Sequence, residues 1–127
     1  MVEIHVAGGR DAFAPGETLR GTLQWLSEVP PQTLELRLLW YTEGRGDRDV
    51  GVARRLRIET PSAVGSSPFE FELPSGPYSC SGRLVSIRWA LEAVTRPGGE
   101  TARTELVVAP AGREVELGSA GARSGAR

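Results

Sequence analysis

Two stretches of strictly alternating side chains, joined by a proline-bracketed link, constrain the fold of this chain most. A two-residue period places successive side chains on opposite faces of an extended strand, with one face buried and the other in water. Pro74 and Pro77 fix φ and lack backbone donors, so the hydrogen-bonded ladder must stop between the two strands. The two apolar faces consist of Phe69, Phe71 and Leu73, and of Val85, Ile87, Trp89, Leu91 and Ala93.

The same alternation recurs in further segments, which are separated by turns rich in proline and glycine. These segments are Val2–Val6, Glu17–Trp25, Leu34–Glu43, Val52–Glu59 and Thr101–Ala109. No long segment shows a helical period, and short strands between regular turns are typical of two packed sheets. The sequence therefore predicts an all-β fold, an antiparallel immunoglobulin-like β-sandwich of seven to eight strands, with Trp25, Trp40 and Trp89 between the sheets.

The length of 127 residues suggests one domain, which we expect to end near residue 110. Residues 111–127 are rich in glycine, alanine and arginine, and this composition predicts a disordered tail. The chain shows no apolar run long enough to span a membrane and no secretion leader at its start, so the expected location is cytoplasmic.

The charges are nearly balanced, with 15 basic and 16 acidic residues, and every basic residue is an arginine. A nucleic-acid-binding domain usually has a high pI and a basic face. The sequence pI of about 5.9 therefore argues against nucleic acid as a partner.

Two separated motifs resemble those of the arrestin-fold family. Residues 12–21, which read Ala-Phe-Ala-Pro-Gly-Glu-Thr-Leu-Arg-Gly, are similar to the opening in which that family turns from its first strand into its second. Phe69-Glu70-Phe71-Glu72-Leu73-Pro74, then Pro77-Tyr78-Ser79 and Gly82, then residues 85–93 resemble the later signature of the same family, in the same order. The resemblance is to a single arrestin-like domain of the bacterial sporulation-control type. It implies an arrestin-type sandwich that binds or scaffolds other proteins.

Residues suited to catalysis or metal binding are scarce. His5 is the single histidine, is expected on the outer face of an edge strand, and has no nucleophile elbow to serve. Cys80 is the single cysteine and is expected to be a small buried residue rather than a reactive thiol. The acids Glu43, Asp47 and Asp49 could hold calcium, but their spacing is not that of an EF-hand. We therefore predict no catalytic, cofactor or metal site.

Two short patterns are read as ordinary surface features. The tripeptide Arg45-Gly46-Asp47 spells a cell-adhesion motif but is also common in polar turns. Glu70 and Glu72 share the solvent face of a strand, where cross-strand pairing or plain solvation is expected rather than acid–base chemistry.

A partner surface is predicted from side chains that point away from the core. If Leu36, Leu38 and Trp40 face inward, Leu39 and Tyr41 face outward, as Val107 does on the last strand. The arginines Arg54, Arg55 and Arg57 form a basic cluster on the strand that follows.

The function predicted from these features is non-catalytic protein binding, as an adaptor or scaffold subunit, through an outer sheet face or an exposed edge strand. The partner could be a second copy of the chain, in a homodimer. The alternative is a small-molecule or carbohydrate-binding sandwich, which would need an aromatic platform open to solvent.

Overall fold

The computed structural model describes residues 1–44, 48–82, 85–97, 99–110 and 115–116. Strands account for most of these residues, and one short 3-10 turn, η1 (Ala7–Gly9), follows the first strand. The part of the chain that the structure describes holds no helix with the length and hydrophobicity that crossing a bilayer requires.

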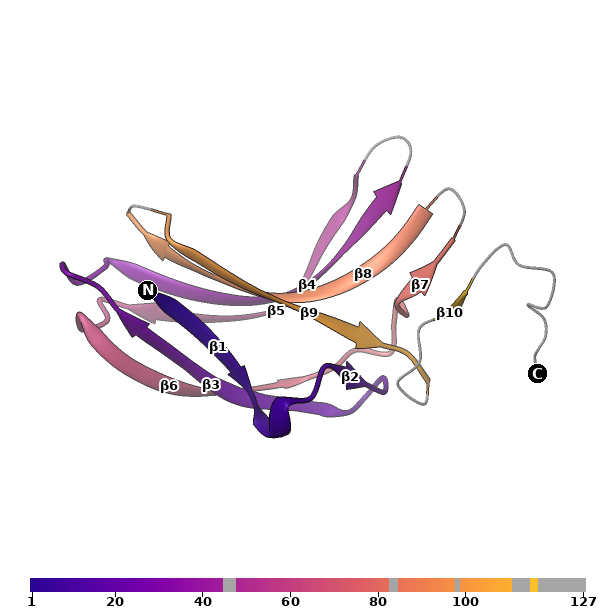
Figure 1. Cartoon of the computed structure of the whole chain (residues 1–127), viewed down its shortest axis with the longest axis horizontal. Coiled ribbons are helices and arrows are strands. Elements are labelled where there is room, and N and C mark those ends of the chain that lie inside the picture. The colour runs from indigo at the N-terminus through magenta and orange to yellow at the C-terminus, as the bar shows by residue number, and fades with distance from the viewer. Residues whose placement is uncertain (45–47, 83–84, 98, 111–114, 117–127) are drawn as a thin grey trace.

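The strands form two layers packed face to face (Figure 1). One layer is a three-stranded antiparallel sheet in the order β1-β3-β6. The larger sheet has the order β10-β7-β8-β4-β5, with β9 paired to β8 and β2 paired to β9. The strands are β1 (Val2–Val6), β2 (Ala12–Phe13), β3 (Thr18–Leu26), β4 (Thr33–Gly44), β5 (Val50–Glu59), β6 (Val64–Glu72), β7 (Cys80–Ser81), β8 (Val85–Arg96), β9 (Thr101–Val108) and β10 (Val115–Glu116).

The predicted all-β sandwich of the arrestin type is confirmed, and each strand expected from the alternation is present. The largest difference lies in β6, which begins at Val64 rather than near Phe69. Residues 65–68 are glycine, serine and proline, so they show no apolar period. They are nevertheless in a strand, because the whole of β6 pairs with β3, from Val64 opposite Leu26 to Glu72 opposite Thr18.

Three two-residue strands were not expected. Two of them form parallel pairs, β2 with β9 and β10 with β7, in an otherwise antiparallel fold. Strand β10 lies beyond the predicted domain end near residue 110, where a disordered tail was expected, and its residues 115 and 116 oppose Cys80 and Ser81. The other residues of the predicted tail lie outside the described part of the chain.

The core fills the space between the layers, as the alternation predicts. Trp89 is fully buried, Trp25 is nearly so, and half-buried Trp40 packs against the same cluster. Both buried indoles have hydrogen-bond partners, because Trp89 Nε1 donates to the carbonyl of Pro77 and Trp25 Nε1 to that of Ser62, each at 2.8 Å. The placement of the three tryptophans between the sheets is therefore confirmed.

A β-bulge interrupts the ladder between β4 and β5. Leu38 pairs with Arg54, whereas the next residue, Leu39, pairs with Val52, so Ala53 is an extra residue on β5. A bulge bends its strand and increases the local twist. Figure 1 shows β4, β5 and β8 curving away from the three-stranded layer, which leaves the outer face of the larger sheet concave.

Candidate interaction surface

A second, smaller group of buried apolar side chains lies on the outer face of the larger sheet. It consists of Leu39, Tyr41 and Ala90, and it is separate from the core between the layers. Leu39 is 4% exposed and Tyr41 is 7% exposed. The prediction that these two side chains face outward is confirmed, but the expectation that they are open to solvent is wrong, because other side chains of the same face cover them.

The outer cluster continues onto the edge strand β5 as exposed apolar surface. Val52 pairs with Leu39, and Val50 pairs with Tyr41. Val50 is 61% exposed and Val52 is 37% exposed. We call Leu39, Tyr41, Val50, Val52 and Ala90 the apolar strip.

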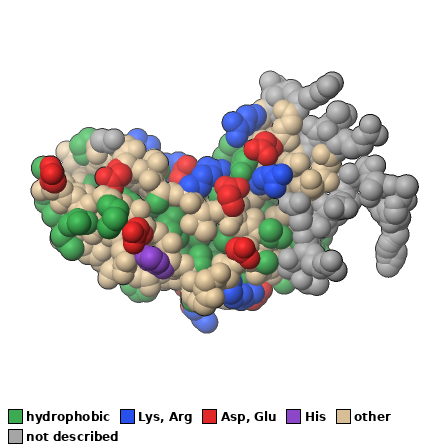
Figure 2. Space-filling view, viewed as in Figure 1, with side chains coloured by type: hydrophobic (Ala, Val, Ile, Leu, Met, Phe, Trp, Pro, Cys, Tyr) green, Lys and Arg blue, Asp and Glu red, His purple; other side chains and the backbone are tan. Residues whose placement is uncertain are grey.

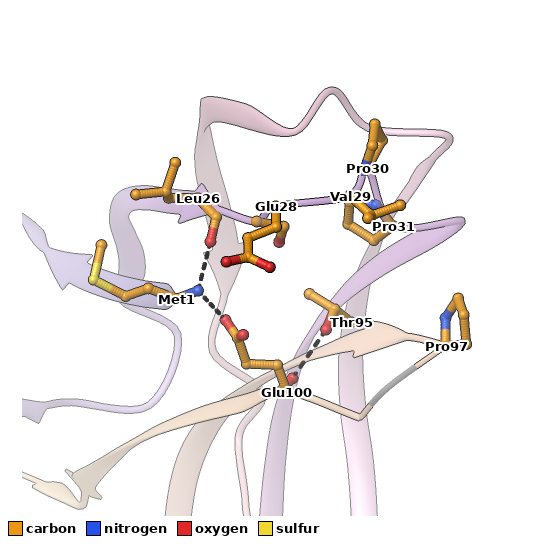
Figure 3. A pocket seen from close by; sticks show the side chains of 10 residues that line it. Met1, Leu26, Glu28, Val29, Pro30, Pro31, Thr95, Pro97 and Glu100 are labelled. Carbon is orange, nitrogen blue, oxygen red and sulfur yellow. Dashed lines mark hydrogen bonds and ion pairs between the residues drawn. The ribbon is translucent and has the colours of Figure 1, made fainter.

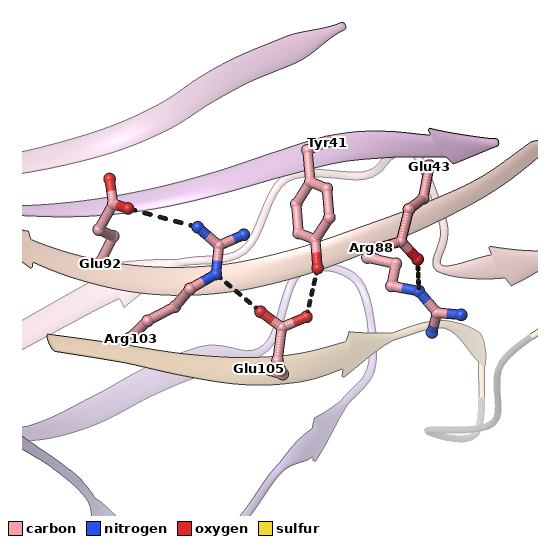
Figure 4. A network of polar contacts seen from close by, with 6 residues as sticks. All are labelled: Tyr41, Glu43, Arg88, Glu92, Arg103 and Glu105. Carbon is pink, nitrogen blue, oxygen red and sulfur yellow. Dashed lines mark hydrogen bonds and ion pairs between the residues drawn. The ribbon is translucent and has the colours of Figure 1, made fainter. Parts of the chain in front are cut away.

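A chain of charged side chains lies over the buried half of the strip (Figure 4). The hydroxyl of Tyr41 donates to Glu105 Oε1 at 2.6 Å. Arg103 donates through Nε to Glu105 Oε2 at 2.9 Å and through Nη1 to Glu92 Oε2 at 3.3 Å. The guanidinium carbon of Arg103 lies 4.7 Å from the centre of the Tyr41 ring, in cation–π range. These contacts cover the ring and shield it from water.

The environment of Tyr41 changes its acidity. Burial raises the pKa of Tyr41, and the hydrogen bond to Glu105 raises that pKa further, while Arg103 opposes both effects. The phenol therefore stays protonated and continues to donate to Glu105 under neutral and mildly alkaline conditions.

The charged chain extends across β4 toward the edge of the sheet. Arg37 Nε donates to Glu35 Oε1 at 2.6 Å, and Arg37 Nη1 lies 3.7 Å from Glu92 Oε1. Burial disfavours ionised Glu35, but the hydrogen bond from Arg37 and the charges of Arg37, Arg55 and Arg57 outweigh it and lower the pKa of Glu35. Glu35 is therefore an anion at neutral pH, fixed by its arginine neighbours.

The structure does not bring the three predicted β5 arginines together. Arg55 opposes Arg37 and Arg57 opposes Glu35, which places both on the outer face. Arg54 opposes Leu38 on the inner side, and its Nη1 donates to the carbonyl of Ala53 at 2.9 Å. The predicted basic cluster is therefore wrong for Arg54, because alternate residues of a strand point to opposite faces.

The exposed edges of both layers carry features that discourage strand addition. Strand β5 pairs with β4 alone among the described strands. It carries the bulge, two outer-face arginines, Arg55 and Arg57, and Arg54 on the inner side. Strand β6 pairs with β3 alone in the same part of the chain, and it contains Pro68. Bulges, charges and proline are the usual devices that protect an edge.

A cavity of about 430 Å³ lies at the end of the sandwich where the loop after β3 meets the turn between β8 and β9 (Figure 3). The amino group of Met1 donates to the carbonyl of Leu26 at 2.5 Å and forms an ion pair with Glu100. The other lining side chains are apolar, acidic or hydroxyl-bearing, with Val29, Glu28 and Thr95 among them. Its polar groups do not make a recognisable catalytic arrangement.

The remaining candidate residues have ordinary surroundings. His5 is exposed on the outer face of β1 and lies 3.1 Å from Glu3. Cys80 is buried, as predicted. Glu70 makes the expected cross-strand pair, with Arg20 at 2.5 Å. Half-buried Val107 packs near the parallel pair with β2.

The suggested calcium acids are not assembled in the described residues, where no three metal-binding side chains come together. Glu43 accepts from Arg88 Nε at 3.0 Å. Asp47, and with it the Arg45-Gly46-Asp47 tripeptide, lies outside the described part of the chain.

The side chains that cover Tyr41, a predicted residue of the partner surface, were not identified from the sequence. These side chains are Glu92, Arg103 and Glu105. Their own alternation opposite Leu91, Thr104 and Leu106 places them on the outer face. What the alternation does not give is the register, in which Glu92 opposes Arg103 and Ala90 opposes Glu105.

Comparison with solved structures supports the fold. Spo0M, a sporulation control protein from Bacillus subtilis, superposes with a TM-score of 0.63 at 18% sequence identity, over 85% of this chain and 48% of that chain. The present chain thus spans about half the length of Spo0M. At this identity the likeness establishes a shared arrestin-like sandwich. No protein-family model and no curated protein sequence matches the chain.

Two further structures match less closely. A superoxide reductase from Ignicoccus hospitalis matches with a TM-score of 0.44, 15% identity and coverage of 85% of this chain and 80% of that one. The alkylpurine DNA glycosylase AlkC of Pseudomonas fluorescens matches with a TM-score of 0.34, 17% identity and coverage of 84% of this chain and 30% of that one. Neither likeness bears on the function of this chain.

Proposed function

We propose that this chain is a non-catalytic protein-interaction module, an adaptor or scaffold subunit of the cytoplasm, which binds a protein partner through the outer face of its larger sheet. The observation that supports this proposal is the apolar strip. A sheet face that meets only water needs no apolar cluster of its own, yet Leu39, Tyr41 and Ala90 form one and Val50 and Val52 extend it into solvent. An apolar centre within a charged rim is the usual anatomy of a protein interface.

The outer face supports the proposal better than the edges do. Both edge strands carry protective features, as described above for β5 and β6. The outer face of the three-stranded layer is polar along most of its length, with His5, Thr22 and Gln24 among its side chains. Its exposed apolar pair, Leu26 and Val64, lies at the end of the ladder and has no buried outer cluster beside it. The strip on the larger sheet is therefore the surface that binding would use.

The alternative of a small-molecule or carbohydrate site has less support. Carbohydrate sites use exposed aromatic platforms, but in the described part of the chain Tyr78 is the one aromatic side chain more than a third exposed. Tyr41 is covered by its neighbours, and the three tryptophans pack in the core.

Capture of partners from an extract of the native cells tests the proposal. Val52→Glu places a charge in the apolar strip, and we expect this substitution to abolish the capture of a protein that the parent chain binds specifically. Val64→Glu is the matched control, because Val64 is 63% exposed on the edge strand of the other layer. The proposal fails if both variants, shown by urea unfolding to be folded, capture the same proteins as the parent chain.

A further inference from the structure

The arginines on the outer face divide into paired and unpaired sets. Four of them have carboxylate partners, and these are Arg37, Arg57, Arg88 and Arg103. Three have none among the described residues, and these are Arg48, Arg55 and Arg96, the last opposite Thr33 on β4. Arg55 makes no hydrogen bond or ion pair there, and Arg48 has only a cation–π contact, its guanidinium carbon lying 5.9 Å from the centre of the Tyr41 ring.

Two of the unpaired arginines, Arg48 and Arg55, flank the exposed part of the apolar strip, whereas Arg96 lies at the far end of β8. Along β5 and its hairpin, Arg48 precedes Val50 and Val52, and Arg55 follows them beyond the bulge. Arg55 also lies directly opposite Arg37 across the ladder, and like charges in that position destabilise a sheet. Asp49 is next to Arg48 in the chain, and the Glu35 carboxylate interacts with the charge of Arg55, so each cationic position is offset in part.

The charges and the curvature together indicate the kind of partner. Because the strands bend along their length, the hollow of the outer face runs across them (Figures 1 and 2). Val52, Leu39 and Ala90 form a cross-strand row in the same direction. Four strands spaced by about 4.8 Å give the hollow a length of roughly 15–20 Å, which about 10–13 residues of α-helix would cover.

Resting on the proposed function, we propose that the outer face binds an acidic amphipathic helix of a partner protein. The apolar side of the helix lies on Val50 and Val52, the exposed part of the apolar strip. Carboxylates on its two flanks meet Arg55 on one side and Arg48 on the other. Helix-in-groove recognition of this kind uses apolar anchors for affinity and flanking charges for specificity.

A second copy of the chain fits this surface poorly. Two concave faces cannot pack closely against each other at their centres. Two β5 edges paired about a two-fold axis would place the arginines at positions 54, 55 and 57 of one copy beside those of the other. An acidic helix meets neither obstacle.

A pair of synthetic peptides tests the inference. Each has 16 residues and a leucine stripe at helical spacing; one carries glutamate on both flanks and the other carries lysine at the same positions. We expect the glutamate peptide to bind the whole chain in fluorescence anisotropy, with affinity that falls as salt increases, and the lysine peptide to bind at least tenfold more weakly.

Variants of the chain then locate the binding. Arg55→Glu should weaken binding of the glutamate peptide about tenfold or more, since a charge-assisted contact is replaced by repulsion. Arg20→Glu makes the same change in net charge on the other layer and should leave the affinity unchanged. Equal binding of the two peptides, or equal effects of the two substitutions, would overturn the inference.

Other outcomes separate this inference from the proposed function. If neither peptide binds but Val52→Glu still abolishes capture of a protein, the acidic-helix inference is wrong and the interaction face stands. The same holds if light scattering shows a dimer that Val52→Glu dissociates, since a second copy would then occupy the face. If neither the peptides nor the capture experiment responds to these changes, both proposals fail.

Discussion

The indole of Trp40 lies directly over Gly51, its cross-strand neighbour on β5. A Cβ atom on residue 51 would come within 2.3 Å of the indole ring. The same arrangement recurs in the other layer, where the ring of Phe69 lies over Gly21 and that of Trp25 lies over Gly65. Aromatic rings that cover glycines across a ladder restore the packing that a glycine lacks, and they fix the register of the pair.

Alanine substitution at these glycines should destabilise the fold. For Gly51→Ala we expect a loss of about 1–3 kcal/mol in the free energy of unfolding, because the new methyl group overlaps the Trp40 ring. Gly21→Ala should cost more, since its Cβ would lie 2.2 Å from the backbone carbonyl oxygen of His5, which cannot move without disturbing β1. Urea unfolding measures both values.

Pairing Gly51→Ala with Trp40→Val provides the control for this overlap. In the Trp40→Val background the methyl group has room, so the added cost of Gly51→Ala should largely disappear. Additive costs in this cycle would show that the ring and the glycine do not interact.

Removing the hydroxyl of Tyr41 should destabilise the chain and change its response to alkaline pH. Tyr41→Phe breaks the 2.6 Å hydrogen bond to Glu105, at a cost of about 1 kcal/mol near neutral pH. Because the folded-state pKa of Tyr41 is raised, its contribution is fully present below the unfolded pKa, near 10, and is lost as the pH rises through the folded value.

The absence of lysine makes this alkaline test unusually clean. Lysine ammonium groups ordinarily titrate near pH 10.4, and because this chain has none, their titration does not overlap the ionisation of Tyr41. The stability of the parent chain should therefore fall as the pH rises above about 10, and that of Tyr41→Phe should fall less. Tyr78→Phe serves as the control, and a fall of the same size in all three chains would contradict the prediction.

Loss of Arg37 should weaken the outer face in a pH-dependent way. Arg37→Ala leaves Glu35 without its 2.6 Å partner, and we expect a cost of about 1–2 kcal/mol at pH 7. The lowered pKa of Glu35 means that its contribution is present above the unfolded pKa and is lost as the pH falls through the folded value. The difference between parent and variant should thus shrink in unfolding measurements below pH 4.5, and a constant difference would refute it.

Ser79 joins β9 to the segment before β7 with a pair of buried hydrogen bonds. Its backbone N–H donates to the carbonyl of Val108 at 2.7 Å, and its hydroxyl accepts from the Val108 N–H at 2.9 Å. Ser79→Ala leaves that N–H buried without a partner, which should cost about 1–3 kcal/mol. Exposed Ser66→Ala should be nearly neutral, and equal unfolding midpoints for the two variants would contradict this assignment.

The sequence predicted the strands well because burial imposes a period of two on each of them. Strand β6 shows where this reasoning ends, since residues 65–68 have no apolar side chain to reveal their pairing with β3. Partners across a sheet depend on register, which alternation does not specify. The side chains that cover Tyr41 therefore could not be identified, because Arg103 and Glu105 lie some sixty positions along the chain.

For the same reason, the sequence predicted the direction of the side chains on the candidate surface but not their burial. The outward direction of Leu39 and Tyr41 follows from the inward direction of Leu38 and Trp40, but their burial follows from neighbours on β8 and β9. The bulge on β5 was equally hidden, because no glycine or proline marks Ala53. The binding face, the peptide partner and the absence of catalysis remain predictions.

The extra residue at Ala53 changes the curvature of the sheet without changing the face to which the neighbouring side chains point. Ala53 and Arg54 together oppose Leu38, while Val52 and Val50 oppose Leu39 and Tyr41. A related chain that lacked this one residue would keep each neighbour on its present side and would lose the curvature alone. Such a chain would present the same side chains on a flatter sheet. Insertion or deletion of a single codon is therefore enough to adapt this surface to a partner of a different shape.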